Sequence, residues 1–296
     1  METVIRIGTH DGVFHADDVF AVAALQRVFV NTIIVRSRNP EVLEKCGILV
    51  DVGGVYDADV NKFDHHQKGR AGERPNGVLY SSFGLVWAKY GEHICGSKEV
   101  ADVVDRRLVQ HVDAIDNGQQ LFEGPPRFHG CAQFNVSTFI SLMNPRYDEG
   151  SDYESGFYAS LTLADHILDR LIESIRGEIA AREQVRQACL AAGNSEVVVF
   201  HRFLPWQTSV LDFASPNAKY VVFPSEAGTW MVQTIPIAPG SFTPRAPLPE
   251  AWGGLRDKEF RETTGLSGAV FCHPGRFIMG ASDLPTALQL AAMASM

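Results

Sequence analysis

Residues 4–25 read VIRIGTHDGVFHADDVFAVAAL, and this stretch decides the class of fold. It begins with a short apolar strand pattern over 4–8, continues through a polar loop and predicts a helix over 16–29. Asp17 and Asp18 fall in the first turn of that helix, where the helix dipole favours anions. Positions 19–25 are apolar nearly all round, so we expect the helix to be mostly buried.

The same alternation of strand and helix continues downstream. Further strand patterns cover 32–36 and 47–51, and helix patterns cover 82–90 and 98–115. Strands that alternate with helices predict a parallel sheet with right-handed crossovers. The N-terminal part therefore reads as a doubly wound parallel sheet.

The second half of the chain has a different texture. Apolar residues recur at steps of three and four from Leu161 to Ile179, which predicts one long amphipathic helix that separates two lobes. Strand patterns then cover 197–200, 220–223, 230–237 and 269–272, and a last helix is expected over 285–293.

We therefore expect an α/β chain with two lobes. A metal-binding domain would cover 1–125, a helical and irregular connection 126–194, and a smaller α/β substrate-binding domain 195–296. Substrate would bind in the cleft between the lobes.

Composition excludes several classes of protein. The 296 residues are 45% hydrophobic and 21% charged, which is typical of a globular chain and not of a disordered or collagen-like one. The net charge of −9 argues against a protein that coats duplex nucleic acid, because that role needs a broad basic surface. Phosphates could still be held by local cations or by bound metal.

The chain is expected to be cytoplasmic. No apolar run approaches the roughly 18 residues that a membrane span needs, and the N-terminus lacks a signal-peptide pattern. The five cysteines are scattered and form no Cys-x-x-Cys pair, which favours reduced thiols.

Histidine and aspartate gather where the first strands are expected to end. His10, His15 and Asp17 follow the first strand and Asp51 ends the third, and in parallel α/β folds ligands bind at this edge. These residue types suit a metal ion. A polar loop with helix-capping acids, and an aspartate that only forms a turn, are the plainer alternatives.

Two later motifs add to this set. Adjacent His65 and His66 suit a loop in which one imidazole binds metal and the other faces substrate, with Asp64 orienting an imidazole. Asp113 and Asp116 lie at a helix C-terminus, where carboxylates oppose the dipole unless a cation compensates. An exposed His pair and a solvated helix end are the alternatives.

Taken together, the clusters offer enough nitrogen and oxygen ligands for two divalent ions and no thiolate. Such ligands suit Mn²⁺, and Mg²⁺ or Co²⁺ less specifically. A two-metal centre clamps a phosphate and activates a bridging water.

The ordered motifs resemble the DHH phosphoesterase superfamily, and more closely its melanocyte-proliferating-gene (Myg-type) branch. The resemblance rests on residues 8–18, 50–57, 63–67 and 113–118, and it extends into the second lobe through 202–206 and 245–256. It implies a metal-dependent hydrolase of exonuclease type.

The resemblance also implies residue roles. His10 and His15 would bind the first metal, with His15 standing where many superfamily members have aspartate. Asp17 and His65 would bind the second metal, and Asp51 would bridge both. His66 would be the catalytic contact to the scissile phosphate. Asp116-Asn117-Gly118 is similar to the Asp-Thr-Gly of relatives, which favours Asp116 over Asp113 as the last ligand.

Substrate contacts are expected from the second lobe as well. Arg245 and Arg276 could hold phosphates, because guanidinium matches phosphate in a bidentate way; exposed arginines that only solvate the surface are the alternative. The segment 273–282 lacks the histidine of the Gly-Gly-His loop that many relatives carry.

The first expectation for function is a 3′–5′ exonuclease or oligoribonucleotide phosphodiesterase that uses a metal-bridged hydroxide on short single-stranded RNA or another small phosphoester. A manganese pyrophosphatase or small-nucleotide phosphatase is the second. A non-catalytic metal- or nucleotide-binding regulator is the third. A homo-oligomer is compatible with each.

Overall fold

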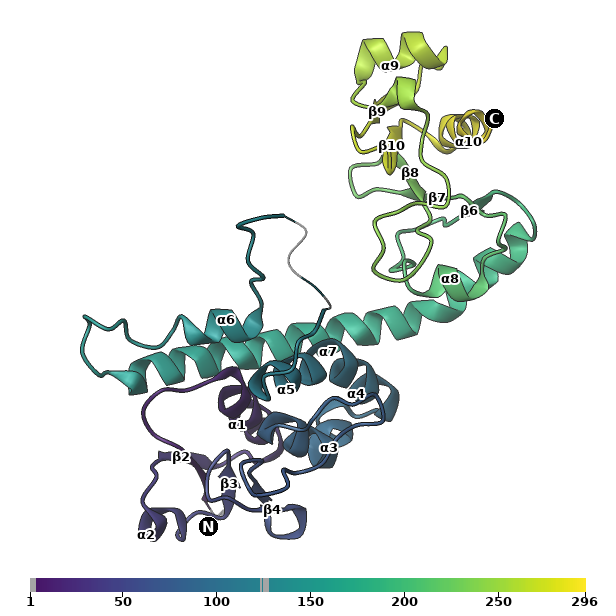
Figure 1. Cartoon of the computed structure of the whole chain (residues 1–296). Coiled ribbons are helices and arrows are strands. Elements are labelled where there is room, and N and C mark those ends of the chain that lie inside the picture. Colours follow the sequence, from purple (N-terminus) through teal and green to yellow (C-terminus); the bar gives the residue numbers. More distant parts are fainter. Residues whose placement is uncertain (1–3, 123, 125–127) are drawn as a thin grey trace. The chain divides into compact units, whose positions relative to one another are not determined.

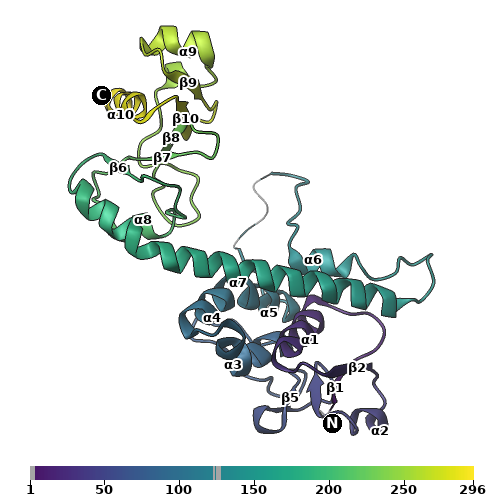
Figure 2. The ribbon, with the colours of Figure 1, turned by 180° about the vertical axis from the view of Figure 1, so that it is seen from behind.

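A computed structural model describes residues 4–122, 124 and 128–296, which form two compact units, Met1–Ile175 and Arg176–Met296 (Figures 1 and 2). The expected boundary at 125 lies outside the described residues. The first unit contains the whole ligand-bearing segment and the first half of the long helix.

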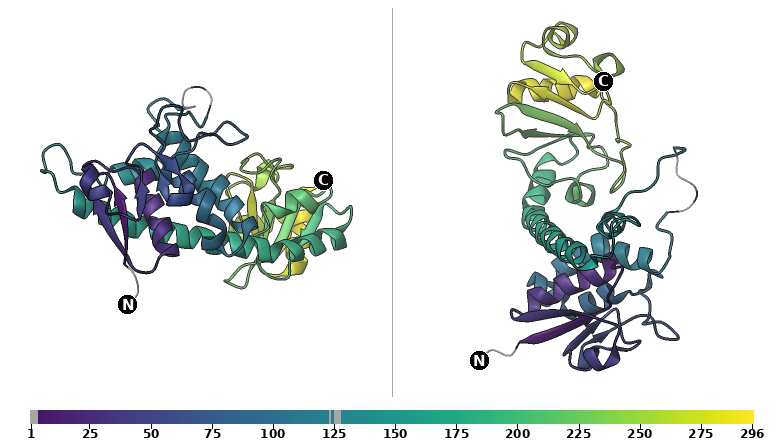
Figure 3. Two further views of the ribbon diagram at one scale, coloured as in Figure 1. Left: turned by 90° about the horizontal axis from the view of Figure 1, so that it is seen from below. Right: turned by 90° about the vertical axis from the view of Figure 1, so that its left-hand side faces the viewer.

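The first unit is built on a five-stranded sheet in the order β2-β1-β3-β5-β4. The purple strands near the N-terminus in Figure 3 belong to this sheet. Its strands are β1 (Ile5–Thr9), β2 (Thr32–Arg36), β3 (Ile48–Val50), β4 (Tyr56–Asp57) and β5 (Lys62–Phe63). All neighbours run parallel except β4 and β5, and Ile7 pairs with both Ile34 and Ile48. The parallel pairing places the ends of β1, β3 and β5, and the polar residues after them, at one edge.

Helices pack beside this sheet. They are α1 (Ala16–Val28), α2 (Pro40–Leu43), α3 (Ser82–Cys95), α4 (Lys98–Val104) and α5 (Gln110–Asp116), with a 3₁₀ turn at Ala58–Val60. The helix expected over 98–115 is interrupted by a π-helical segment, Asp105–Val109. Helix α1 is buried from Ala16 to Leu25 and packs on α3, as its apolar sequence predicts.

The first unit continues with α6 (Val136–Ser141) and the long helix α7 (Tyr153–Ala192). Phe157, Leu161 and Leu168 are fully or almost fully buried along the early turns of α7. The predicted amphipathic helix is therefore present, and it extends beyond the expected ends in both directions.

The second unit has a sheet in the order β6-β7-β8-β10-β9. Its elements are β6 (Val197–Val199), α8 (Ser209–Phe213), β7 (Tyr220–Pro224), β8 (Trp230–Thr234), a 3₁₀ turn (Glu250–Trp252), α9 (Asp257–Thr264), β9 (Ala269–Cys272), β10 (Ile278–Ala281) and α10 (Leu284–Ala294). Only β6 and β7 are parallel.

Alternation along β7 divides the apolar residues of the second unit into two cores. Tyr220 and Val222 pack with residues of α9 and α10, whereas Val221 and Phe223 pack with Val185 and other residues of α7 and α8. Both faces of the sheet are thus covered, as the period of two predicts.

The prediction of an α/β chain with a parallel sheet in its first lobe and a smaller α/β second lobe is confirmed. Among the residues that the structure describes, no helix combines the length and apolar character that crossing a membrane requires.

Candidate metal centre

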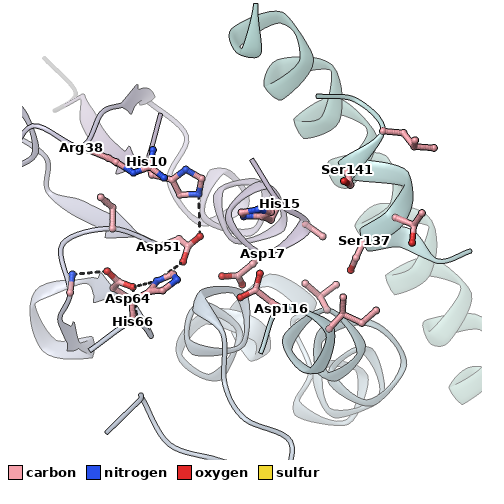
Figure 4. Close-up of a pocket in the computed structure, with 17 residues that line it drawn as sticks. His10, His15, Asp17, Arg38, Asp51, Asp64, His66, Asp116, Ser137 and Ser141 are labelled. Carbon is pink, nitrogen blue, oxygen red and sulfur yellow. Dashed lines mark hydrogen bonds and ion pairs between the residues drawn. The ribbon is translucent and has the colours of Figure 1, made fainter. Parts of the chain in front are cut away.

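Five of the six predicted metal ligands, all except His65, line one cavity of about 890 Å³ (Figure 4). It lies at the edge of the sheet where β1, β3 and β5 end, and α1, α5 and α6 complete its walls. The lining residues are His10, His15, Ala16, Asp17, Arg38, Asp51, Val52, Gly54, Asp64, His66, Val112, Ile115, Asp116, Ser137, Thr138, Ser141 and Leu142.

Asp51 lies at the centre of the cluster. Its Oδ2 is 3.2 Å from His10 Nε2, and its Oδ1 is 3.4 Å from both His65 Nε2 and His66 Nδ1. Asp51 adopts a left-handed backbone with φ of 55°, which aspartate tolerates better than most residues and which re-aims its side chain at the end of β3. One carboxylate therefore contacts three imidazoles, His10 through Oδ2 and both His65 and His66 through Oδ1.

Charge coupling around Asp51 is strong. Burial alone would raise the pKa of Asp51, but the close contacts and charge of His10 and His65 outweigh it and hold that pKa below the usual range. Burial opposes the charged form of His65, yet the close carboxylates of Asp116 and Asp51 raise its pKa to about 11. The cluster thus attracts positive charge.

His65 also contacts two further acids, Asp17 and Asp116. Its Nε2 lies 3.1 Å from Asp116 Oδ2 and 3.8 Å from Asp17 Oδ2. One donor atom from each of Asp17, His65 and Asp116 falls within a 4.8 Å span, as do donor atoms of Asp51, His65 and His66. These are the spacings of groups that could surround a cation.

Asp17 is held rigidly by the start of α3. Its carboxylate accepts hydrogen bonds from the backbone N–H groups of Ser82, at 3.0 Å, and Phe83, at 2.6 Å, and from the Ser81 hydroxyl. Burial, followed by the charges of Asp51 and Asp116, raises the pKa of Asp17 well above its usual value. A bound cation would relieve this repulsion.

Asp64 and His66 form a pair at the rim. Asp64 Oδ1 accepts from His66 Nδ1 at 2.8 Å, and Asp64 Oδ2 accepts from Gly54 N at 2.6 Å. The His66 side chain is 62% exposed, whereas that of His65 is only 6% exposed. Because the Asp64 carboxylate accepts at Nδ1, the Nε2 atom of His66 is left for another partner.

The two candidate acids of α5 occupy different surroundings. Asp113 is buried, accepts from Arg74 Nη1 at 2.6 Å and Gly84 N at 3.0 Å, and lies 2.5 Å from Ser81 Oγ. A Cβ at Gly84 would lie 2.0 Å from Asp113 Oδ2, so only glycine admits this approach. Asp116 instead lines the cavity beside His65.

Sequence reasoning missed two features of the cavity. The sequence predicts only a first-turn anion at Asp18, yet a carboxylate oxygen of Asp18 lies with donor atoms of His10, His15 and Asp51, all within 4.8 Å of one another. One wall of the cavity is formed by Ser137 and Ser141 of α6 and by Leu142, which follows α6. No sequence pattern predicted this wall, because only tertiary packing brings it to the loops that carry the candidate ligands.

The residues fit divalent metal. Asp17, Asp18 and Asp51 are almost fully removed from solvent, and the buried Asp18 Oδ2 has no hydrogen-bond partner. Buried, crowded carboxylates without a compensating cation are costly. The donor set is oxygen and imidazole, which fits Mn²⁺.

Arg245 and Arg276 belong to the second unit. Arg245 Nη1 donates to the backbone carbonyls of Ser215 and Ala218, each at 3.0 Å, and Arg276 Nη1 lies 3.4 Å from Leu248 O. Both guanidinium groups thus bond locally. Their contact with substrate, and the expected cleft between the lobes, stay predictions.

The chain is similar in sequence to known proteins over almost its whole length. A mouse protein named MYG1 exonuclease is 34% identical over 319 residues, covering 97% of this chain and 83% of its own length. MYG1 protein C694.04c of Schizosaccharomyces pombe is 32% identical over 317 residues, covering 98% and 97%.

A solved structure also matches, although weakly. RecJ from Thermus thermophilus in complex with Mn²⁺ covers 98% of this chain at 13% identity, with a TM-score of 0.27, and this chain spans 52% of its length. A TM-score this low does not identify the fold or the metal.

The family model MYG1_exonuc, described as "Uncharacterised protein family (UPF0160)", matches residues 6–295. Since this match spans nearly the whole chain and the relatives share a third of their residues with it, the chain belongs to the MYG1 exonuclease family.

Proposed function

We propose that this chain is a metal-dependent phosphoesterase that releases nucleotides from the 3′ end of short single-stranded oligonucleotides, RNA first among them. The observation that carries the proposal is that Asp51, which lines the cavity with further acids and the exposed His66, contacts both His10 and His65. The names of the family relatives agree with this chemistry.

Two divalent ions, with Mn²⁺ preferred, are proposed to bind here. The first would be held by His10, His15 and Asp51, and the second by Asp17, Asp51, His65 and Asp116. When bound, such ions stabilise charge on the phosphate and lower the pKa of a coordinated water towards neutrality.

The chain's own groups prepare this site. Ser81 and the N–H groups at the start of α3 fix Asp17, so its carboxylate needs little reorganisation when it binds a cation. Asp64 fixes the His66 ring through Nδ1, which leaves Nε2 to contact the phosphate. In its protonated form His66 would donate to the phosphate oxygen on which charge grows.

The cavity suits a nucleotide in size and lining. A volume of about 890 Å³ lies within the range of small-molecule sites, and the lining combines the Ser137 and Ser141 hydroxyls with apolar Ile115. We assign the sugar of the terminal nucleotide to these residues. In the second unit, Arg245 and Arg276 are proposed to bind phosphate.

A substrate panel tests the proposal. Metal-free protein is supplied with Mn²⁺ and given oligoribonucleotides, oligodeoxyribonucleotides, pyrophosphate and mononucleotides, with EDTA and Asp51→Asn as negative controls. Release of mononucleotides that ceases in both controls supports the proposal. Orthophosphate from pyrophosphate alone would favour a phosphatase, and no turnover on any substrate would favour a binding regulator.

A further inference from the structure

A carboxylate outside the predicted ligand set lies beside the first pair of imidazoles. Asp18 has no exposed surface, and it contributes a donor atom to the group of His10, His15 and Asp51. We propose that Asp18 is a direct ligand of the ion held by these three residues. The inference rests on the metal dependence proposed above and deepens it.

The two oxygens of Asp18 have different surroundings. Oδ1 accepts the backbone N–H of His15 at 2.7 Å, which fixes the carboxylate at the start of α1. Oδ2 is buried, has no hydrogen-bond partner, and lies 3.5 Å from His10 Nε2. A buried carboxylate oxygen left unpaired costs about 1–3 kcal/mol or more. A cation between this oxygen and the imidazoles would satisfy it.

Asp17 cannot take this place. Successive side chains of a helix point about 100° apart, so Asp17 and Asp18 of α1 point in different directions. Asp17 is directed to α3, where Ser81, Ser82 and Phe83 donate to it. Asp18 is directed to His10 and to the loop that carries His15.

Charge balance supports the assignment. With neutral imidazoles, the group of His10, His15 and Asp51 offers a single carboxylate, and Asp51 also reaches His65 of the second group. Asp18 supplies a second negative charge, which matches the charge of a divalent ion. Asp18 also adds an oxygen ligand, the donor type that Mn²⁺ favours.

Metal titration of the full chain tests the assignment without any substrate. Metal-stripped wild type and Asp18→Asn are titrated with MnCl₂ by calorimetry, and bound metal is counted by elemental analysis after gel filtration. We expect the wild type to hold two ions and Asp18→Asn to hold one, with the first site weakened by more than about 100-fold, beyond the loss typical of residues that only support a ligand.

Two comparisons make the titration specific. Asp102→Asn removes an exposed acid that pairs with Lys98 and should bind both ions like the wild type. Visible spectra with Co²⁺ should change between wild type and Asp18→Asn, because the spectrum follows the ligands that contact the ion. If Asp18→Asn folds poorly, as judged by thermal melting in EDTA, Asp18→Ser is titrated instead.

The failures are distinguishable. Two ions of wild-type affinity in Asp18→Asn would overturn the ligand assignment and leave the proposed function intact. Weaker binding with an unchanged Co²⁺ spectrum would also overturn it, since Asp18 would then only position His10. A wild type that binds no Mn²⁺ or Co²⁺ would overturn the proposed function together with this inference.

Discussion

The side-chain amide of Asn144 bonds both backbone polar groups of Phe14, although 130 residues separate them. Phe14 N donates to Asn144 Oδ1 at 3.1 Å, and Asn144 Nδ2 donates to Phe14 O at 2.9 Å. The Phe14 ring is fully buried and packs edge-on against Phe157 of α7. This contact anchors the loop that carries His10 and His15 to the segment that precedes α7.

Asn144→Ala should therefore weaken both the fold and the first metal site. Losing two partly buried hydrogen bonds is expected to cost about 1–3 kcal/mol of unfolding free energy, measured by urea denaturation. Mn²⁺ affinity should fall about tenfold, because the His15 loop becomes mobile. Asn76→Ala, which removes an exposed amide contact with Gln110, is the control. Unchanged stability and metal affinity in Asn144→Ala would contradict this role.

Arg74→Met should be among the most damaging substitutions outside the ligand set. Arg74 is 6% exposed and pairs with buried Asp113 at 2.6 Å and with Asp105 at 2.7 Å. Removing one partner of a buried ion pair costs about 3–5 kcal/mol, since the remaining charge is left unpaired. Thermal and urea denaturation measure the loss.

The double variant Arg74→Met/Asp113→Asn separates charge from packing. Neutralising Asp113 should recover part of the stability lost in Arg74→Met, because the fully buried charge is then removed and only the partly exposed Asp105 is left without Arg74. Lys98→Met, which breaks an exposed pair with Asp102, should change stability by less than about 1 kcal/mol. A double variant less stable than Arg74→Met alone would show that Asp113 is not the source of the cost.

His65→Ala and His66→Ala should fail in different ways. His65 is buried among Asp51, Asp116 and Asp17, so its removal should lower Mn²⁺ occupancy as well as turnover. His66 is exposed and tied to Asp64, so its removal should preserve metal binding and lower kcat by about 100-fold or more. Elemental analysis beside steady-state kinetics checks the division, and equal metal loss in both variants would refute it.

Metal binding should release protons and become tighter as pH rises. Despite burial, the close carboxylates of Asp116 and Asp51 raise the pKa of His65 to about 11, so it is protonated at neutral pH and must lose its proton to bind metal. Burial raises the pKa of Asp18 to about 7, so its carboxyl is also partly protonated there. Calorimetry in buffers of different ionisation enthalpy counts the protons, and binding without proton release would contradict the expectation.

The metal-free protein should also lose stability as pH rises. Both groups have a folded pKa above the ordinary value, so their stabilising contribution is complete below the unfolded pKa and is lost as pH passes the folded one. For Asp18 that window extends from 3.8 to about 7, and for His65 from 6.5 to about 11. Urea denaturation in EDTA should therefore show lower stability at about pH 8 than at about pH 6, and saturating Mn²⁺ should reduce the difference.

Local patterns were enough to predict much of the fold. Helix and strand periods are local properties of the sequence. They therefore predicted the strand over 4–8, the apolar helix after it and the long helix that contains Leu161. The sequence did not predict the hairpin of β4 and β5 or the π-helical segment at Asp105–Val109. Two-residue strands and single irregular turns are too short to give a periodic pattern.

The sequence by itself determined which residue types gather at the ends of the first strands, since parallel strands bring those ends to one edge. Only the tertiary structure decided which member of each pair points where. Asp17 and Asp18 are neighbours on one helix. Backbone N–H groups at the start of α3 bond Asp17, whereas Asp18 faces His10. Asp113 and Asp116 differ in the same way, because Arg74 pairs with Asp113 while Asp116 contacts His65. Those choices depend on partners from distant segments, and spacing along the chain carries no information about them.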